Sequence, residues 1–215
     1  MIRVVIVDDH SLIRIGLKSR IDPIIDMQVV GETSTAAELL KNLSQWNPSV
    51  VILDITLPDK NGLDVLKQLK EDFPHIEVII LSMHPEERYA LRAYKAGAAG
   101  YLSKGIENLS EKLVKAIRMV VTHKTKYVSK HFAPELAKYM YDSERGETKK
   151  HQKLSDREFQ VFCMIASGKS TAEIAESLSI TVQTVYSYRN RAREKLSLQS
   201  DVDFTRYAIL NNLID

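Results

Sequence analysis

Residues 50–66 read VVILDITLPDKNGLDVL, an apolar run that stops at one aspartate and leads through a polar loop into a helical pattern. The run Val50–Leu53 is apolar at successive positions, which is typical of a strand covered by helices on both faces. Three leucines then recur at helical spacing, Leu63, Leu66 and Leu69. This stretch predicts a strand, a loop and a helix, with Asp54 at the carboxyl end of the strand.

The same alternation runs through the first half of the chain. Apolar, β-branched runs predict strands at Ile2–Val7, Gln28–Glu32, Val50–Leu53, Glu77–Leu81 and Ala99–Leu102. Amphipathic stretches between them predict helices near Ser11–Ile21, Thr35–Trp46, Gly62–Phe73, Glu86–Ala96 and Asn108–Thr122. Alternating strands and helices imply right-handed crossovers and a parallel sheet. We therefore expect an α/β fold, a five-stranded parallel doubly wound (flavodoxin-like) sheet of order 2-1-3-4-5.

Acidic side chains follow two of these strands. Asp8 and Asp9 close the first strand and Asp54 closes the third. In a sheet of this order the cleft lies at the carboxyl ends of those two strands, so the three carboxylates should meet there. Carboxylates so close repel one another unless a cation lies among them, and an oxygen-ligand site with open positions suits Mg²⁺. Ser82 ends the fourth strand and Lys104 follows the fifth, where a lysine would neutralise a transferred phosphate.

Composition and cysteine content limit the class of protein. Hydrophobic residues make up 44% and charged residues 27% of the 215 residues, as in globular proteins. The single cysteine, Cys163, excludes an internal disulfide and lies in an apolar stretch, which indicates a buried, inert thiol. The first apolar run is interrupted by aspartates, unlike a leader, and no run approaches the ~18 residues of a membrane helix. We expect a cytoplasmic protein that does not enter a membrane.

The second half of the chain has a different pattern. Residues 124–152 predict a linker with one short helix, Pro134–Tyr141, and a polar run after it. Beyond it, Ser155 with Glu158 and Ser170 with Glu173 have capping-box spacing, and Gly168 suits the end of the preceding helix. Four short helices follow one another, the last over Val202–Asn211, and the middle pair has helix-turn-helix proportions. We expect domains at 1–123 and 153–215.

A basic excess lies in the second half. Residues from Lys124 onward carry 15 Lys+Arg against 12 Asp+Glu, while the first 123 residues carry 15 against 16. In the predicted third helix, one apolar stripe consists of Val182, Val185, Ala192 and Leu196. On the opposite side Tyr186, Ser187, Asn190 and Arg193 are expected to be exposed. Asn190 is expected to contact bases, and Tyr186 and Ser187 to contact bases or phosphates. Thr184 is a further expected DNA contact. Phosphate contacts are expected from Lys169, Arg189, Arg191, Arg193 and Lys195. On charge and periodicity alone, an interaction module with a solvated basic face remains an alternative.

The first 123 or so residues resemble the receiver domain of two-component response regulators. The resemblance rests on VVIVDDH (4–10), VILDITLPDKNGLDVL (51–66) and VIILSMHPEERYALRAYKAGAAGYLSK (78–104). It implies Asp54 as the phosphoacceptor, and Asp8, Asp9, Asp54 and the Thr56 carbonyl as ligands of Mg²⁺. It also implies Ser82 as the switch hydroxyl, Lys104 as the phosphate partner and Tyr101 as the switch aromatic. Gly105 stands where many receivers have proline.

Residues 154–196, LSDREFQVFCMIASGKSTAEIAESLSITVQTVYSYRNRAREKL, resemble the LuxR/NarL (FixJ) helix-turn-helix. Together the two resemblances imply a DNA-binding transcriptional response regulator. A sensor histidine kinase would phosphorylate Asp54, and phosphorylation would control homodimerisation and binding to double-stranded promoter DNA, with RNA polymerase as a further partner. The last helix holds apolar surface for the core and for a second subunit, with Tyr207 and Leu210 as candidate subunit contacts. The protein would not be an enzyme, beyond its own phosphorylation and slow hydrolysis.

Other chemistries fit the residues less well. A phosphatase of the haloacid-dehalogenase type needs a second acid two residues after the nucleophile, where this chain has Thr56. The GKS triplet at Gly168 lacks the upstream glycine and the strand of a P-loop. Two further alternatives keep the same fold: a phosphorylation-independent regulator whose receiver is a protein-interaction platform, and an RNA-binding antiterminator.

Overall fold

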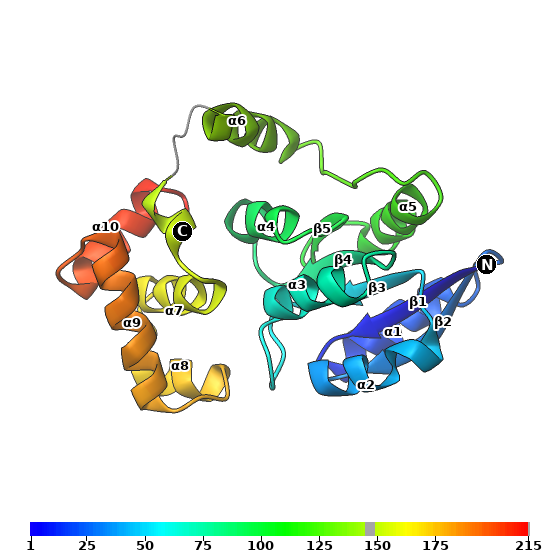
Figure 1. Cartoon of the computed structure of the whole chain (residues 1–215), viewed down its shortest axis with the longest axis horizontal. Helices are drawn as coiled ribbons and strands as arrows, with labels where there is room; N and C mark the ends of the chain where they lie inside the picture. The colour runs from blue at the N-terminus through cyan, green and yellow to red at the C-terminus, as the bar shows by residue number, and fades with distance from the viewer. Residues whose placement is uncertain (145–148, 215) are drawn as a thin grey trace. The chain divides into compact units, whose positions relative to one another are not determined.

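The computed structural model describes residues 1–144 and 149–214. The chain divides into two compact units, Met1–Phe132 and a second that begins at Ala133. Each unit has its own secondary structure and its own buried core (Figure 1).

The first unit is a five-stranded sheet of order β2-β1-β3-β4-β5, with every neighbouring pair parallel. The strands are β1 (Ile2–Val7), β2 (Met27–Thr33), β3 (Val50–Leu53), β4 (Glu77–Ser82) and β5 (Gly100–Ser103). The predicted order and all five strands are confirmed. Three strands differ from the prediction by one residue at one or both ends, because the ends of the ladders are set by pairing with neighbours and not by apolar content alone.

Helices cover both faces of this sheet (Figure 1). They are α1 (Ser11–Ile21), α2 (Ala36–Trp46), α3 (Gly62–Asp72), α4 (Glu86–Lys95) and α5 (Leu109–Val121). One face packs on α1 and α5 through Leu17, Ile21, Leu113 and Ile117. Burial on both faces explains why Val50–Leu53 is apolar without alternation, since all four residues are buried.

Residues 124–132 differ from the predicted linker, because they belong to the first unit. Tyr127 forms an isolated parallel bridge with Gly100, and the Phe132 side chain is 1% exposed. No periodic pattern among residues 124–132 indicates these contacts. The predicted short helix is α6 (Ala133–Glu144), longer than Pro134–Tyr141 at both ends.

The second unit contains α6, a short 3-10 helix η1 (Lys150–Lys153) and four α-helices. These are α7 (Asp156–Ala166), α8 (Thr171–Ser177), α9 (Val182–Leu196) and α10 (Asp201–Leu210). Both predicted capping boxes are present, at Ser155 with Glu158 and at Ser170 with Glu173. Gly168 has a φ of 85° directly after α7, as expected for a residue that ends a helix in the left-handed region.

Aromatic residues fill the core of this second unit. Phe162 contacts Phe204 with ring centroids 5.1 Å apart, and it also packs against Phe159 and Tyr207. Cys163 is buried beside them, as its apolar context indicated. Among the residues described, no helix combines the length and apolarity needed to cross a membrane.

Candidate functional site

The strand order places two aspartates side by side at one edge of the sheet. Val7 and Leu53, the last residues of β1 and β3, are register partners, so Asp8 and Asp54 leave neighbouring strands together. The Asp54 backbone N–H donates to the Val7 carbonyl over 2.9 Å, which extends the ladder to the site itself. Both side chains are almost fully buried, with 2% of Asp8 and 3% of Asp54 exposed.

Lys104 lies between these two carboxylates. Its Nζ is 2.7 Å from Asp8 Oδ2 and 2.7 Å from Asp54 Oδ2, and the side chain is 2% exposed. The Lys104 backbone N–H donates to the Ser82 carbonyl over 2.7 Å, which ties the end of β5 to the end of β4. The sheet thus brings together three residues that lie far apart in sequence, as the positions of the strand ends predicted.

The charges at this site do not balance. Three carboxylates, from Asp8, Asp9 and Asp54, face one ammonium, so two negative charges remain when all are ionised. Burial raises the pKa of Asp54, and Asp8 raises it further, whereas Lys104 lowers it. For Lys104, burial lowers the pKa, but the charges and hydrogen bonds of Asp54 and Asp8 outweigh burial and raise it. A divalent cation would supply the missing positive charge.

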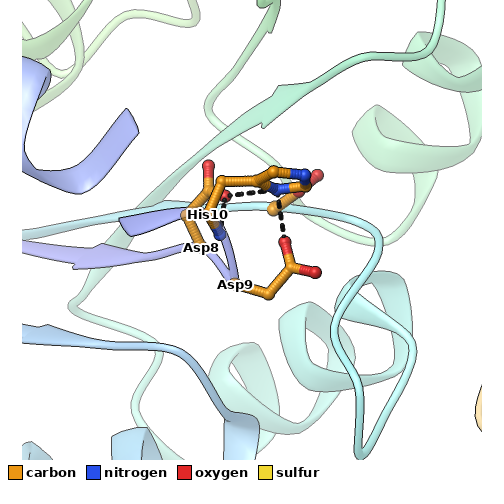
Figure 2. A group of neighbouring side chains, drawn as sticks. Asp8, Asp9 and His10 are labelled. Atoms are coloured by element: carbon orange, nitrogen blue, oxygen red, sulfur yellow. Dashed lines mark hydrogen bonds and ion pairs between the residues drawn. The ribbon is translucent and has the colours of Figure 1, made fainter. Parts of the chain in front are cut away.

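Asp9 and His10 complete the acidic end of the site. Figure 2 shows the His10 ring lying across the aspartate pair, with Nδ1 2.6 Å from Asp9 Oδ1 and 3.3 Å from Asp8 Oδ1. Potential ligand atoms of Asp8, Asp9, His10 and Asp54 all lie within 4.8 Å of one another. His10 was not predicted as a site residue, although its position directly after the aspartate pair was a usable signal.

The donor set fits a hard divalent cation, since carboxylate oxygens dominate it and negative charge is in excess. The predicted ligand Thr56 lies beside Asp54, and its backbone N–H reaches Asp54 Oδ1 at 3.4 Å. The backbone of Thr56 is held by an antiparallel bridge to Asn61.

Ser82 and Tyr101, the predicted switch residues, form a connected group next to this site. Ser82 is fully buried, and its Oγ accepts a hydrogen bond from the His84 backbone N–H over 3.3 Å. Tyr101 is fully buried too, and its hydroxyl donates to the His84 carbonyl over 2.8 Å. Burial raises the pKa of Tyr101, and a side-chain hydrogen bond with Ser82 opposes the rise. The ring of Tyr101 therefore lies inside the protein, with its hydroxyl on the loop that follows β4.

In the second unit, α9 presents one buried and one exposed side. Val185, Ala192 and Leu196 are buried, but Val182 is 40% exposed, so the predicted apolar stripe is wrong at its first residue. Val182 lies in the first turn of α9, before the helix reaches the core. Most predicted DNA-contact residues are exposed, namely Lys169, Tyr186, Ser187, Asn190, Arg191 and Lys195.

Five of the predicted DNA-contact residues already bond within the domain, and one of them is Ser187, whose hydroxyl donates to the Gln183 carbonyl over 3.1 Å. Arg189 makes a two-pronged ion pair with Asp201 at 2.9 and 2.7 Å. Lys195 lies 2.6 Å from Glu158 Oε2, and Arg193 donates to the Gln199 carbonyl. The Thr184 backbone N–H donates to Oγ1 of Thr181, the residue that caps the start of α9. The ion pairs of Arg189 and Lys195 join α9 to α10 and α7, so these two side chains help to orient the helix.

Family models match both units of the chain. The model described as response regulator receiver domain matches residues 4–118, and that of the bacterial regulatory proteins, luxR family, matches residues 152–208. The response regulator GacA of Pseudomonas aeruginosa is 34% identical over 215 residues, covering 100% of this chain and 99% of the relative. The response regulator UvrY of Escherichia coli is 34% identical over 213 residues, covering 99% and 96%.

The chain belongs to the response regulators of the NarL/LuxR family.

Solved structures share its fold. RcsB of Salmonella enterica serovar Typhimurium, bound to promoter rprA with the phosphomimetic BeF3⁻, has a TM-score of 0.65 at 23% identity, covering 96% of this chain and 98% of that one. A LuxR-family response regulator from Aurantimonas sp. SI85-9A1 has a TM-score of 0.58 at 29% identity, covering 65% and 97%.

Two further residues of this response regulator shape the loop that follows Asp54, and neither was predicted from the sequence. Gly62 approaches the Asp54 backbone so closely that a Cβ there would lie 2.0 Å from the Asp54 carbonyl oxygen. Asn61 is 1% exposed, and its Oδ1 accepts the Leu63 backbone N–H at the start of α3. The adjacent Asn-Gly pair after the strand was the available signal, since such pairs mark tight backbone turns.

The last helix divides its apolar residues between the core and the surface. Tyr207, a predicted subunit contact, packs on Phe162, and its hydroxyl accepts the His151 backbone N–H over 3.3 Å. Leu210, the other predicted subunit contact, is 74% exposed. Val202 and Ile209 are also exposed, at 77% and 52%. Tyr207 is therefore engaged within its own unit, while the exposed residues keep apolar surface available.

Proposed function

We propose that a sensor histidine kinase transfers a phosphoryl group to Asp54, and that this transfer controls promoter binding by the second domain. The observation that carries the proposal is the position of the Lys104 ammonium, 2.7 Å from both Asp54 and Asp8. A buried aspartate beside a fixed cation is an oxygen nucleophile with a charge partner for the phosphate that it would accept.

The residues around Asp54 have separate roles in this proposal. Mg²⁺, held by Asp8, Asp9, Asp54 and the Thr56 carbonyl, would neutralise charge on the phosphoryl oxygens. Lys104 would bind one phosphate oxygen and the Ser82 hydroxyl another. Ser82 lies in the same hydrogen-bonded group as Tyr101, so a displacement of its hydroxyl would reach the aromatic switch.

The output domain is proposed to bind duplex DNA as a homodimer. The related RcsB is described in its solved structures as bound to promoter DNA, and as two dimers on two parallel DNAs. In this chain Tyr186, Ser187 and Asn190 lie exposed on α9, where base edges of the major groove would be in reach. Thr184 would contribute from the first turn. Phosphate contacts would come from Lys169, Arg189, Arg191, Arg193 and Lys195.

The domain assignment follows the same proposal. Residues 1–123 form the phosphoacceptor fold and residues 153–215 the DNA-binding domain. Within the proposed linker 124–152, residues 124–132 pack on the first unit and α6 follows them. We place this regulator in the cytoplasm, with RNA polymerase as a further partner. It acts on no external substrate.

Intact-mass measurement tests the acceptor site. The purified protein is incubated with Mg²⁺ and a small-molecule phosphodonor, beside the Asp54→Asn variant. The proposal predicts one added phosphoryl group in the parent and none in the variant. An adduct that persists in Asp54→Asn would move the acceptor elsewhere, and no adduct in the parent at short times and low temperature would favour the phosphorylation-independent alternative.

A further inference from the structure

Residues 125–132, here called the strap, run along the open edge of the sheet after α5. The Tyr127 backbone N–H donates to the Ala99 carbonyl over 2.8 Å, and Tyr127 bridges to Gly100 in parallel register. A methyl group at Gly100 would lie 3.3 Å from the Tyr127 Cβ, so glycine permits this close approach. The strap therefore adds one rung of backbone pairing to β5, the strand that carries Tyr101.

Side chains bind the strap to α4 as well. The Tyr94 hydroxyl donates to the Tyr127 carbonyl over 2.6 Å, and the Ser129 hydroxyl donates to Glu86 Oε2 over 2.6 Å. The buried Phe132 ring stacks on Tyr94, with centroids 6.1 Å apart. These contacts all reach α4 or the strand beside it, so the position of α4 determines whether the strap can bind.

The contact beneath the strap is incomplete. A cavity of about 840 Å³ lies between the strap, β5 and α5, lined among others by Tyr101, Ile106, Met119, Tyr127 and Val128. Within the described part of the chain, Glu86 Oε1 is buried without a hydrogen-bond partner. Burial also raises the pKa of Glu86, which the Ser129 hydrogen bond only partly opposes. Since a buried carboxylate oxygen without a hydrogen-bond partner is costly, undocking that exposes Glu86 to water would recover free energy, which offsets part of the lost contacts.

A short path joins the strap to the phosphorylation site. Glu86 is the first residue of α4, two residues after His84. The His84 backbone bonds to both switch residues, through its N–H to Ser82 and its carbonyl to Tyr101. A phosphoryl group that draws the Ser82 hydroxyl toward Asp54 would disturb this loop and the Glu86 end of α4.

We propose that the strap is a releasable part of the receiver, docked while Asp54 is unmodified and released when Asp54 is phosphorylated. The inference rests on the proposed function, because it needs a phosphoryl group on Asp54. Release would turn residues 125–132 into a free tether between α5 and α6, at up to ~3.3–3.6 Å per residue. Tether length sets the effective concentration of a linked domain, so release changes how readily two DNA-binding domains meet on one site.

Hydrogen exchange at the Tyr127 amide tests the release. Full-length protein is compared with and without Mg²⁺ and a small-molecule phosphodonor, with the phosphorylated fraction read from its mass. Tyr127 should exchange about tenfold faster after phosphorylation, a factor within the usual range of allosteric coupling. In Asp54→Asn its exchange should not respond to the phosphodonor. Unchanged or slower exchange in phosphorylated protein would overturn the release while leaving the proposed function intact. Absence of any adduct would overturn both.

Variants of the strap test the coupling from the other end. Ser129→Ala and Phe132→Ala should each speed Tyr127 exchange without any phosphodonor, while the Leu53 amide in β3 stays protected. Because coupling is reciprocal, both variants should also raise the phosphorylated fraction at limiting phosphodonor. Lys130→Ala, at an exposed position of the same strap, is the matched control and should change neither quantity. Faster exchange with an unaltered phosphorylated fraction would show that strap and site are uncoupled, which contradicts the proposal.

Discussion

At the scale of single residues, the site depends on one lysine that serves two buried carboxylates. Lys104 compensates only part of the negative charge, and burial with the neighbouring Asp8 raises the Asp54 pKa. The ionised acceptor is therefore held at a cost to stability. In the proposed function this cost is offset, because the same excess of charge would attract Mg²⁺ and phosphoryl transfer would need the ionised nucleophile.

This cost predicts a stabilising substitution at Asp54. The raised folded-state pKa means that the folded protein holds the Asp54 proton more tightly than the unfolded chain, so ionisation penalises folding as pH rises above the ordinary value of 3.8. Without Mg²⁺, Asp54→Asn should raise the free energy of unfolding at pH 7, and the gain should vanish as pH falls below 3.8. Urea unfolding across pH measures this, with Asp64→Asn as a partly exposed control. A loss of stability at pH 7 would contradict the account.

Gly62 allows a second prediction at this scale. In Gly62→Ala the new methyl would meet the Asp54 carbonyl oxygen at 2.0 Å, so the backbone at the acceptor must move. We expect a loss of ~1–3 kcal/mol in the free energy of unfolding, the usual cost of overpacking, together with slower phosphorylation. The matched control is Gly16→Ala in α1, where nothing lies within 4 Å and a gain in helix propensity is expected. Equal effects of the two changes would contradict the close-approach argument.

The sequence predicted the acid, serine and lysine set because strand order alone determines where strand ends meet. That rule alone was enough to predict that Asp8, Asp54 and Lys104 lie close together. It did not predict Asn61 or Gly62, whose roles come from the path of the loop after β3. Nor did it predict the pairing of Lys195 with Glu158, because that contact joins helices whose packing angle no periodicity reveals.

At the scale of elements, α9 has side chains that bond to neighbouring helices and exposed side chains that are proposed to contact DNA. Arg189 and Lys195 bond to α10 and α7, while Asn190 and Arg191 are exposed. Helical spacing predicted the faces of α9 well, except at Val182, where the first turn leaves the core. It could not distinguish a cation that reaches solvent from one that a neighbouring helix holds.

The pair of Lys195 and Glu158 predicts a pH-dependent loss of stability. Burial raises the pKa of Glu158, but the Lys195 and Ser155 hydrogen bonds outweigh it and lower the pKa below 4.5. The ionised pair therefore stabilises the fold above pH 4.5, and this contribution is lost as pH falls through the lowered pKa. Lys195→Met should lower the free energy of unfolding at pH 7, and the deficit should shrink in acid. Thermal melts from pH 7 to 3 would show it, and a deficit independent of pH would argue against the pair.

The exposed side of α9 gives a prediction about DNA. Asn190→Ala should weaken the free energy of binding to a preferred duplex by ~1–3 kcal/mol, because a base contact is lost, and should change binding to random DNA little. Arg191→Ala should weaken binding to both duplexes alike. It should also lower the slope of log affinity against log salt concentration by about one. Salt-titrated binding isotherms distinguish the two variants. Equal losses on both duplexes from Asn190→Ala would remove the base-reading role of this residue.

At the scale of the whole molecule, two domains of different architecture share one chain and one proposed signal. The sequence predicted both folds, since each has its own periodicity and its own motifs. It drew the first boundary at residue 123, whereas the first compact unit continues to Phe132. The strap was not predicted because one backbone rung and a few side-chain contacts leave no repeating pattern in the sequence.

The central claim is that a phosphoryl group on Asp54 changes DNA binding by a domain that Asp54 is not part of. The most direct test is the affinity of the full-length protein for a duplex selected from a randomised pool, with and without Mg²⁺ and a phosphodonor. Phosphorylation should tighten binding by roughly 5–150-fold, the usual range of coupling between sites, and Asp54→Asn should show no response. Full phosphorylation by mass with unchanged affinity would contradict the account.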